Sequence, residues 1–144
     1  MKILLPFAVI VVIFMSSCNE SKHDTAKQII HSIQNATNKM RQTGESEFEI
    51  KIPANSQYKV IYFYPYTSFD NIRVENSIKK KLERIAFSME KPFFVVVEDD
   101  NLLEYCNVDF ALDPSGEMPM VWSAHHGIIC IKIQKKQDGA YVLY

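Results

Sequence analysis

The chain has 144 residues and a formal net charge of −1 at pH 7. This length suits one domain with a hydrophobic core, and the nearly balanced charge excludes the strongly basic class of nucleic-acid-binding proteins. Four Gly and six Pro are too few for a low-complexity or disordered chain.

The N-terminal segment has the layout of an export signal. Lys2 precedes an apolar run over residues 3–15, which is shorter than the roughly 20 residues of a membrane-spanning helix. The run ends in Met15-Ser16-Ser17-Cys18. This ending resembles the lipobox of bacterial lipoprotein precursors, although that family usually has Leu where Met15 stands. The resemblance implies that residues 1–17 are removed and that Cys18 receives diacylglycerol and a fatty acyl chain such as palmitate.

Residues 18–24 are polar and are expected to form a lipidated tether. In the sorting rule of bacterial lipoproteins, Asp directly after the lipidated Cys favours the inner membrane. Asn19 occupies that position here, so the resemblance implies the outer membrane, with the domain in the periplasm. The alternatives are an ordinary cleaved signal with an incidental cysteine, or an uncleaved anchor.

Residues 25–144 are expected to form a single globular domain. A helix is predicted over residues 24–42, because its apolar residues recur at three- and four-residue spacing. Residues 45–52 alternate between charged and apolar side chains, and residues 57–64 form a second apolar strand. The turn residues 53–56 between them predict an antiparallel hairpin.

A second helix is predicted from Thr67 or Ser68 to about residue 89. Its apolar stripe consists of Val74, Ile78, Leu82, Ile85 and Met89. The basic residues 79–81 and Arg84 lie off this stripe, on a face that contacts either solvent or anionic lipid headgroups.

The remaining chain is rich in strands. The apolar run over residues 93–98 predicts a central strand, followed by a hairpin turn and a strand over residues 102–108. Residues 109–127 read as a long irregular stretch, and strands follow over residues 128–134 and 140–144. Short turns between strands favour antiparallel pairing. The sequence therefore predicts an α+β two-layer sandwich in which two helices cover one face of a mainly antiparallel sheet of about six strands.

Cys106 and Cys130 remain after lipidation of Cys18, in an exported protein where disulfides persist. If the strands that carry them were antiparallel neighbours, with Cys106 opposite Cys130, then Glu104 would lie opposite Lys132. Leu103 would lie opposite Ile133, which gives an apolar pair beside a charged one. We therefore expect these strands to be neighbours. A disulfide and two free thiols both remain open.

His125 and His126 are the most suggestive candidates for chemistry. Neighbouring histidines in a loop can bind metal, with Asp113 or Glu117 as oxygen ligands. Surface histidines without a ligand are the alternative. The chain has no nucleophile elbow, Gly-rich phosphate loop or HExxH helix, and we expect neither a cofactor nor a catalytic residue.

A charge asymmetry gives a stronger hint of a partner. No Lys or Arg occurs from Pro92 to Ile131, although this stretch is rich in acids and aromatic residues. Acids with aromatic anchors are typical of an interface for a protein with a basic surface. The alternative is that the acids solvate loops while the aromatic residues enter the core. The expected partner-binding residues are Asp99, Asp100, Asp109, Asp113, Glu117 and Trp122.

These observations favour a lipid-anchored periplasmic protein that binds another protein without catalysing a reaction. An immunity or inhibitor protein and an envelope-assembly factor are two versions of this function. The alternative is a small envelope hydrolase or metal-binding protein centred on His125 and His126.

Overall fold

A computed structural model describes residues 22–99, 101–107 and 112–144. The expected signal peptide, Cys18, Asp100 and Asp109 lie outside these residues. The described elements are α1 (Lys22–Thr43), β1 (Glu47–Pro53), β2 (Tyr58–Phe63), α2 (Asn76–Ser88), β3 (Phe93–Glu98), β4 (Asn101–Asn107), β5 (Asp113–Pro114), β6 (Met120–Ser123), β7 (Ile128–Lys135) and β8 (Tyr141–Leu143). None of the described helices is long and apolar enough to cross a bilayer.

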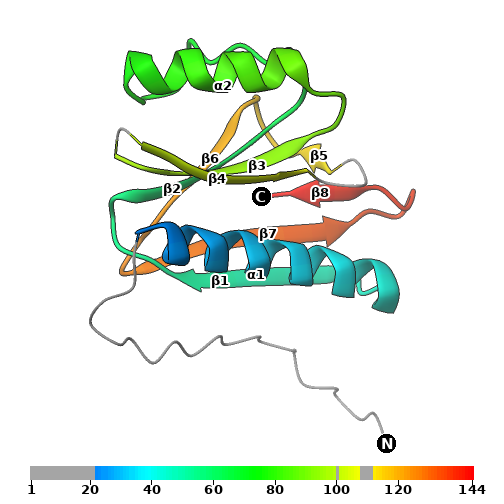
Figure 1. The fold of residues 1–144 in the computed structure, drawn as a ribbon. Coiled ribbons are helices and arrows are strands. Elements are labelled where there is room, and N and C mark those ends of the chain that lie inside the picture. Colours follow the sequence, from blue (N-terminus) through cyan, green and yellow to red (C-terminus); the bar gives the residue numbers. More distant parts are fainter. Residues whose placement is uncertain (1–21, 100, 108–111) are drawn as a thin grey trace, which may run out of the picture.

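The described part has an α+β fold with two sheets (Figure 1). One sheet has the strand order β4-β3-β2-β6 and the other has the order β1-β7-β8-β5. The strands pair antiparallel except β5 and β8, which are parallel. Four strands in each of two sheets replace the single sheet of about six strands that the sequence predicts.

One hydrophobic core, which we call the upper core after its place in Figure 1, lies between α2 and the β4-β3-β2-β6 sheet. Alternate residues of β2 and β3, namely Ile61, Phe63, Phe93, Val95 and Val97, point into it. Ile78, Leu82 and Ala86 of α2 are buried against them. Their spacing of four residues puts them on one face of the helix, so the predicted apolar stripe correctly identifies the buried side of α2.

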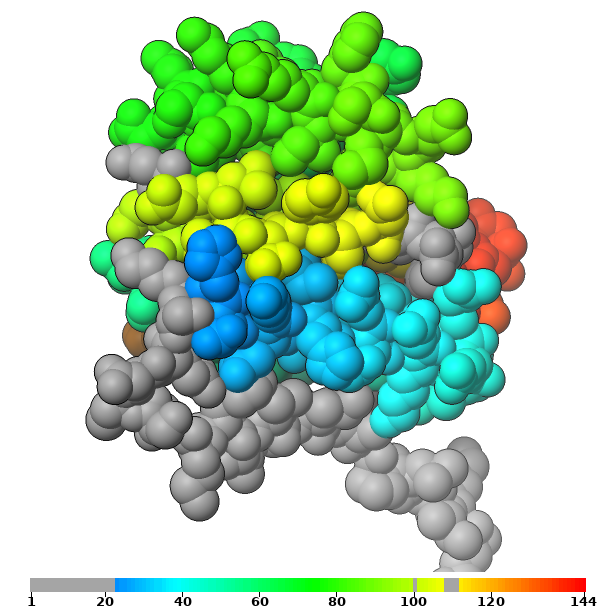
Figure 2. Space-filling view, in the orientation of Figure 1, coloured from blue at the N-terminus to red at the C-terminus, as the bar shows by residue number. Residues whose placement is uncertain are grey.

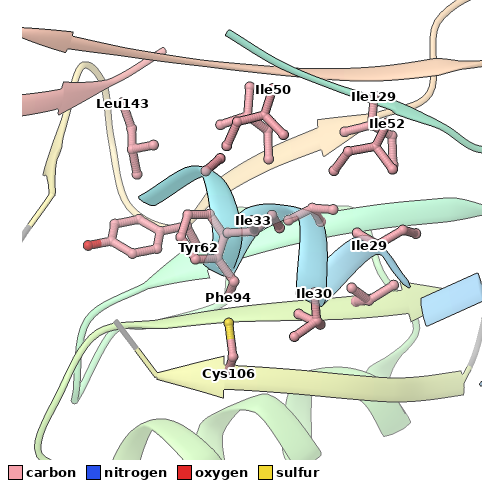
Figure 3. Packing of buried hydrophobic residues seen from close by; sticks show 14 of the residues in the cluster. Ile29, Ile30, Ile33, Ile50, Ile52, Tyr62, Phe94, Cys106, Ile129 and Leu143 are labelled. Atoms are coloured by element: carbon pink, nitrogen blue, oxygen red, sulfur yellow. The ribbon is translucent and has the colours of Figure 1, made fainter. Parts of the chain in front are cut away.

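The lower core lies on the opposite face of the same sheet. Val60, Tyr62, Phe94 and Val96 face it, together with inward residues of α1, β1 and β7 (Figure 3). α1 packs against β3 and β4 of one sheet and β1 of the other, and thereby closes one side of this core. The apolar face predicted for α1 is buried: Ala26, Ile29, Ile30, Ile33, Ala36 and Met40.

The prediction that both helices cover one face is wrong, because α1 and α2 lie on opposite faces of the β4-β3-β2-β6 sheet. Residues 93–98 are buried at every position. A strand that is apolar on both faces needs a cover on each side, and the two helices supply it from opposite sides.

The predicted hairpin of residues 45–52 with residues 57–64 is also wrong. β1 pairs with β7, and β2 pairs with β3 and β6 in the other sheet. β1 exposes Glu47 and Lys51 on one face, whereas β2 is buried on both faces. The intervening turn therefore carries the chain from one sheet to the other.

The expected pairing of the strands that carry Cys106 and Cys130 is wrong as well. β4 pairs with β3, which places Cys106 opposite Phe94. β7 lies between β1 and β8, and Cys130 lies opposite Lys51. In this register Lys132 lies opposite Glu49, beside the apolar pairs Phe48–Ile133, Ile50–Ile131 and Ile52–Ile129. β1 thus gives β7 more complementary pairs than β4 would.

The start of α2 and the strand content of residues 109–127 differ from the prediction. α2 begins at Asn76 rather than near Ser68, because Thr67 closes a turn in which its hydroxyl bonds the backbone of Tyr64. Residues 109–127, expected to be irregular, include β5 and β6. The last strand, β8, lies between β7 and β5.

Candidate binding surface

Two aromatic side chains contact each other on the outside of the domain. Tyr66 is 75% exposed and Phe87 is 74% exposed. Their rings meet edge to face, with centroids 5.6 Å apart, and the Tyr66 backbone N–H donates to the Ala86 carbonyl at 3.0 Å. Both side chains therefore keep large apolar surfaces in water while the backbone fixes their position.

The backbone of Tyr66 adopts a conformation that is rare for its residue type. Its φ is +62°, a region that costs bulky residues conformational energy. A core residue can recover such a cost through packing, but the side chain of Tyr66 is exposed. Strain of this kind gathers at functional sites, so Tyr66 marks a candidate binding surface.

A tyrosine clamp lies at the same end of β2. The Tyr62 and Tyr64 hydroxyls both donate to the Leu112 carbonyl, at 3.0 Å and 2.8 Å. The Leu112 N–H donates back to the Tyr62 hydroxyl at 3.3 Å. Burial raises the pKa of Tyr62 well above its ordinary value. Burial and, to a smaller degree, the charge of Asp113 raise the pKa of Tyr64. The clamp thus fixes Asp113 beside Tyr64.

The three expected acidic residues that the structure describes, Asp99, Asp113 and Glu117, divide between two ends of the domain. Asp99 lies at the start of the β3–β4 hairpin, where its N–H donates to Gln57 before β2 begins. Asp113 interacts electrostatically with Tyr64 just beyond the end of β2. Glu117 is three residues before Met120, which pairs with Tyr62, so it belongs to the Asp113 end. Both are exposed. These three described acids therefore do not form one continuous patch.

We define the distal surface as Tyr64, Tyr66, Phe87, Asp113 and Glu117. In Figure 1 the C-terminal end of α2 and β5 lie on the side opposite to the N-terminal end of α1. α1 has 22 residues and is therefore about 33 Å long. The distal surface thus lies far from the point where the expected tether would join the domain.

Trp122 is not part of this surface. It is half-buried against the lower core, and its ring lies 6.1 Å from that of Phe94. Its indole N–H donates to the Tyr144 carbonyl at 3.0 Å. This contact joins β6 to the end of β8, which is a structural role.

His125 and His126 lie in the tight turn between β6 and β7. His125 and Ile128 exchange two backbone hydrogen bonds, and His126 and Gly127 have φ angles of +51° and +77°. The two rings lie 4.1 Å apart and both side chains are exposed. β6 separates this turn from Asp113 and Glu117. Among the described residues no three His, Cys, Asp or Glu side chains converge as metal ligands.

The two cysteines are free and belong to different sheets. Cys106 is buried in the lower core beside Phe94 (Figure 3), where burial raises the pKa of its thiol to about 11. The thiol of Cys130, on the outer face of β7, donates to Glu49 at 3.1 Å. This hydrogen bond, followed by Lys51 and Lys132, lowers the pKa of Glu49. Neither thiol is activated as a nucleophile, because burial raises both thiol pKa values.

A shallow depression lies beside each of the two helices. One, of about 410 Å³, is lined by Lys80, Glu83, Arg84 and Phe87 on α2, so side chains of both charge signs lie beside Phe87. The other, of about 430 Å³, lies between α1 and β4; its lining includes Lys27, His31 and Glu104. Figure 2 shows β4 as a strip between α2 and α1 on this face.

No family model matches the chain, and neither curated proteins nor solved structures give a match. The distal surface therefore rests on its own geometry. Sequence patterns single out neither Tyr66 nor Phe87, but one signal was available. Phe87 is a large apolar residue off the apolar stripe of α2, and such a residue on the outer face of a helix indicates a contact outside the domain.

Proposed function

We propose that this chain is a lipid-anchored protein of the bacterial envelope whose periplasmic domain binds another protein through the distal surface. The lipobox-like ending at Cys18 supports the anchor, with the outer membrane as the expected location. An immunity or inhibitor protein and an envelope-assembly factor are two forms of such a module.

The exposed pair of Tyr66 and Phe87 carries the proposal of a protein partner. Aromatic residues are enriched at the energetic centres of protein interfaces, and this pair keeps both rings in solvent at a conformational cost for Tyr66. Asp113 and Glu117 at the same end of the domain favour a partner with basic residues. We expect the complex to weaken as salt rises, because these acids are exposed.

Lipidation is tested with Cys18→Ser in the full chain. The intact protein from membranes should carry a diacylglycerol and acyl mass on a chain that begins at Cys18, and Cys18→Ser should remain unmodified. A Cys130→Ser variant is the matched control and should be lipidated normally. An unmodified wild-type chain, or one cleaved elsewhere, would remove the anchor from the proposal without affecting the binding surface.

Partner binding is tested by affinity isolation from envelope extract with the full chain in detergent. The wild type should retain one stoichiometric protein, and Tyr66→Ala with Phe87→Ala should lose it. Asp113→Asn with Glu117→Gln should weaken retention at low salt. Ile128→Ala is the matched control, since Ile128 is 40% exposed in β7 next to the His125–His126 turn. Equal retention by all variants, or equal loss in the Ile128 variant, would refute the distal surface as the site.

A further inference from the structure

β4 is an edge strand whose protection against strand pairing is confined to its first half: its register with β3 shifts between Val96 and Val97, whereas residues 104–107 pair regularly with residues 93–96. It ends the β4-β3-β2-β6 sheet, and β1 ends the other sheet with the same length of seven residues. β1 carries Glu47, Glu49 and Lys51 and ends in Pro53. Such charges and prolines are how proteins block unwanted strand pairing. β4, with the sequence NLLEYCN, has Glu104 as its one charged residue.

The hydrogen-bond pattern shows which backbone groups of β4 face outward. Just beyond the Tyr58–Glu98 end of the β2–β3 ladder, the Asp99 N–H donates to the Gln57 carbonyl, so the odd-numbered residues of β3 direct their backbone groups towards β2. Because the pattern alternates, Val96 and Phe94 direct their groups towards β4. Their partners are Glu104 and Cys106, so the N–H and C=O groups of Tyr105 and Asn107 point away from the sheet.

Both faces of this edge are flanked by helices. α1 packs on β3 and β4 from the lower side, and α2 approaches β4 from the upper side. Figure 2 shows the strip of β4 between the two helices. A second copy of the chain would bring its own α1 and α2 against these helices, whereas a single extended segment needs little more than the width of one strand.

We propose that the β4 edge binds an extended segment of another protein, which adds to the sheet as a further strand. Backbone bonds to Tyr105 and Asn107 provide affinity, as in other cases of strand addition. Tyr105, which is 50% exposed, offers its ring to an apolar side chain of the segment. Glu104 lines the depression beside α1 together with Lys27 and His31. β4 itself carries Glu104 and no Lys or Arg, which favours a basic residue in the part of the segment that lies along β4.

The proposal is tested with a defined probe on the full chain in detergent. The probe is a capped seven-residue peptide of alternating Val and Lys, and the readout is hydrogen exchange of backbone amides. Saturating peptide should slow the exchange of Tyr105 and Asn107 at least tenfold. The same peptide with N-methyl groups on the edge-facing residues is the matched control, since it keeps the side chains and loses the donors.

Two variants separate backbone from side-chain recognition. Tyr105→Pro removes the outward N–H, and an edge strand tolerates Pro at such a position, so this variant should fold and lose the protection of Asn107. Tyr105→Ala keeps the N–H and should bind several-fold more weakly. Unchanged exchange at Tyr105 and Asn107, equal protection by the N-methylated peptide, or undiminished binding by Tyr105→Pro would each overturn the proposal. Dimers of this chain that Tyr105→Pro abolishes would replace the partner segment by a second copy.

Discussion

The tyrosine clamp on Leu112 makes a quantitative prediction about stability. Tyr62→Phe removes one bond to the Leu112 carbonyl and leaves the buried Leu112 N–H without its described acceptor. A buried polar group without a partner costs roughly 1–3 kcal/mol, so we expect Tyr62→Phe to lower the free energy of unfolding by about 2 kcal/mol. Tyr64→Phe should cost about 1 kcal/mol, because the carbonyl keeps Tyr62 as a donor.

The double variant separates this clamp from ordinary packing. With both hydroxyls gone, the carbonyl loses both donors, so the loss should exceed the sum of the single effects by roughly 1–2 kcal/mol. Urea unfolding followed by circular dichroism measures all four proteins. Tyr105→Phe is the control, because its ring lies on the exposed edge of β4, and it should change stability by less than about 0.5 kcal/mol. Strict additivity, or a Tyr62→Phe loss as small as that of Tyr105→Phe, would refute the reasoning.

Three further predictions follow from single residues. Burial raises the pKa of Cys106 from 9.0 to about 11, so the contribution of its thiol to stability is complete below pH 9 and is lost as pH rises through 11. Relative to Cys106→Ala, the wild type should lose about 2 kcal/mol of unfolding free energy between pH 8 and 10.5. Parallel pH profiles of the two proteins would contradict this. Gly127→Ala should lower the free energy of unfolding by about 1–2 kcal/mol, because φ is +77° at this position. The added Cβ meets nothing within 4 Å, so this cost comes from the backbone conformation and not from a clash. Unchanged urea unfolding would show that the turn relaxes. In the folded protein, maleimide should modify the half-buried Cys130 before the buried Cys106, and mass spectrometry of the peptides would show the order. The reverse order would contradict the burial of the two thiols.

The sequence was most informative where burial alone determines the pattern. The continuous apolar run at residues 93–98 correctly predicts a central strand, because a strand covered on both faces has no polar positions. The alternation in β1 correctly predicts that Phe48, Ile50 and Ile52 face the core. Alternation specifies a face and not a neighbour, however, so the choice of β2 as the partner of β1 failed.

The same distinction explains the mistaken cysteine register. Complementary charge and apolar pairs are a sound criterion, but β1 offers β7 more of them than β4 does. The sequence does not predict the distal surface, for a different reason. Tyr66 and Phe87 come together through the packing of a loop on the end of α2, and the positive φ of Tyr66 leaves no mark in the sequence. The partner-binding role of the acidic residues stays a prediction, and the separation of Asp99 from Asp113 and Glu117 depends on the sheet topology.

The pairing of β1 with β7 has a consequence for how the chain folds. Residues 47–53 pair with residues 128–134, so this ladder closes over most of the chain, whereas the β3–β4 hairpin is local. Contacts between distant residues form slowly because loop closure costs entropy before any pairing repays it. We therefore expect β2, β3 and β4 to pair first, before the distant strands β6 and β7 pair with β2 and β1. Until β7 arrives, β1 lacks its partner strand, and this interval is when the chain is most prone to aggregate.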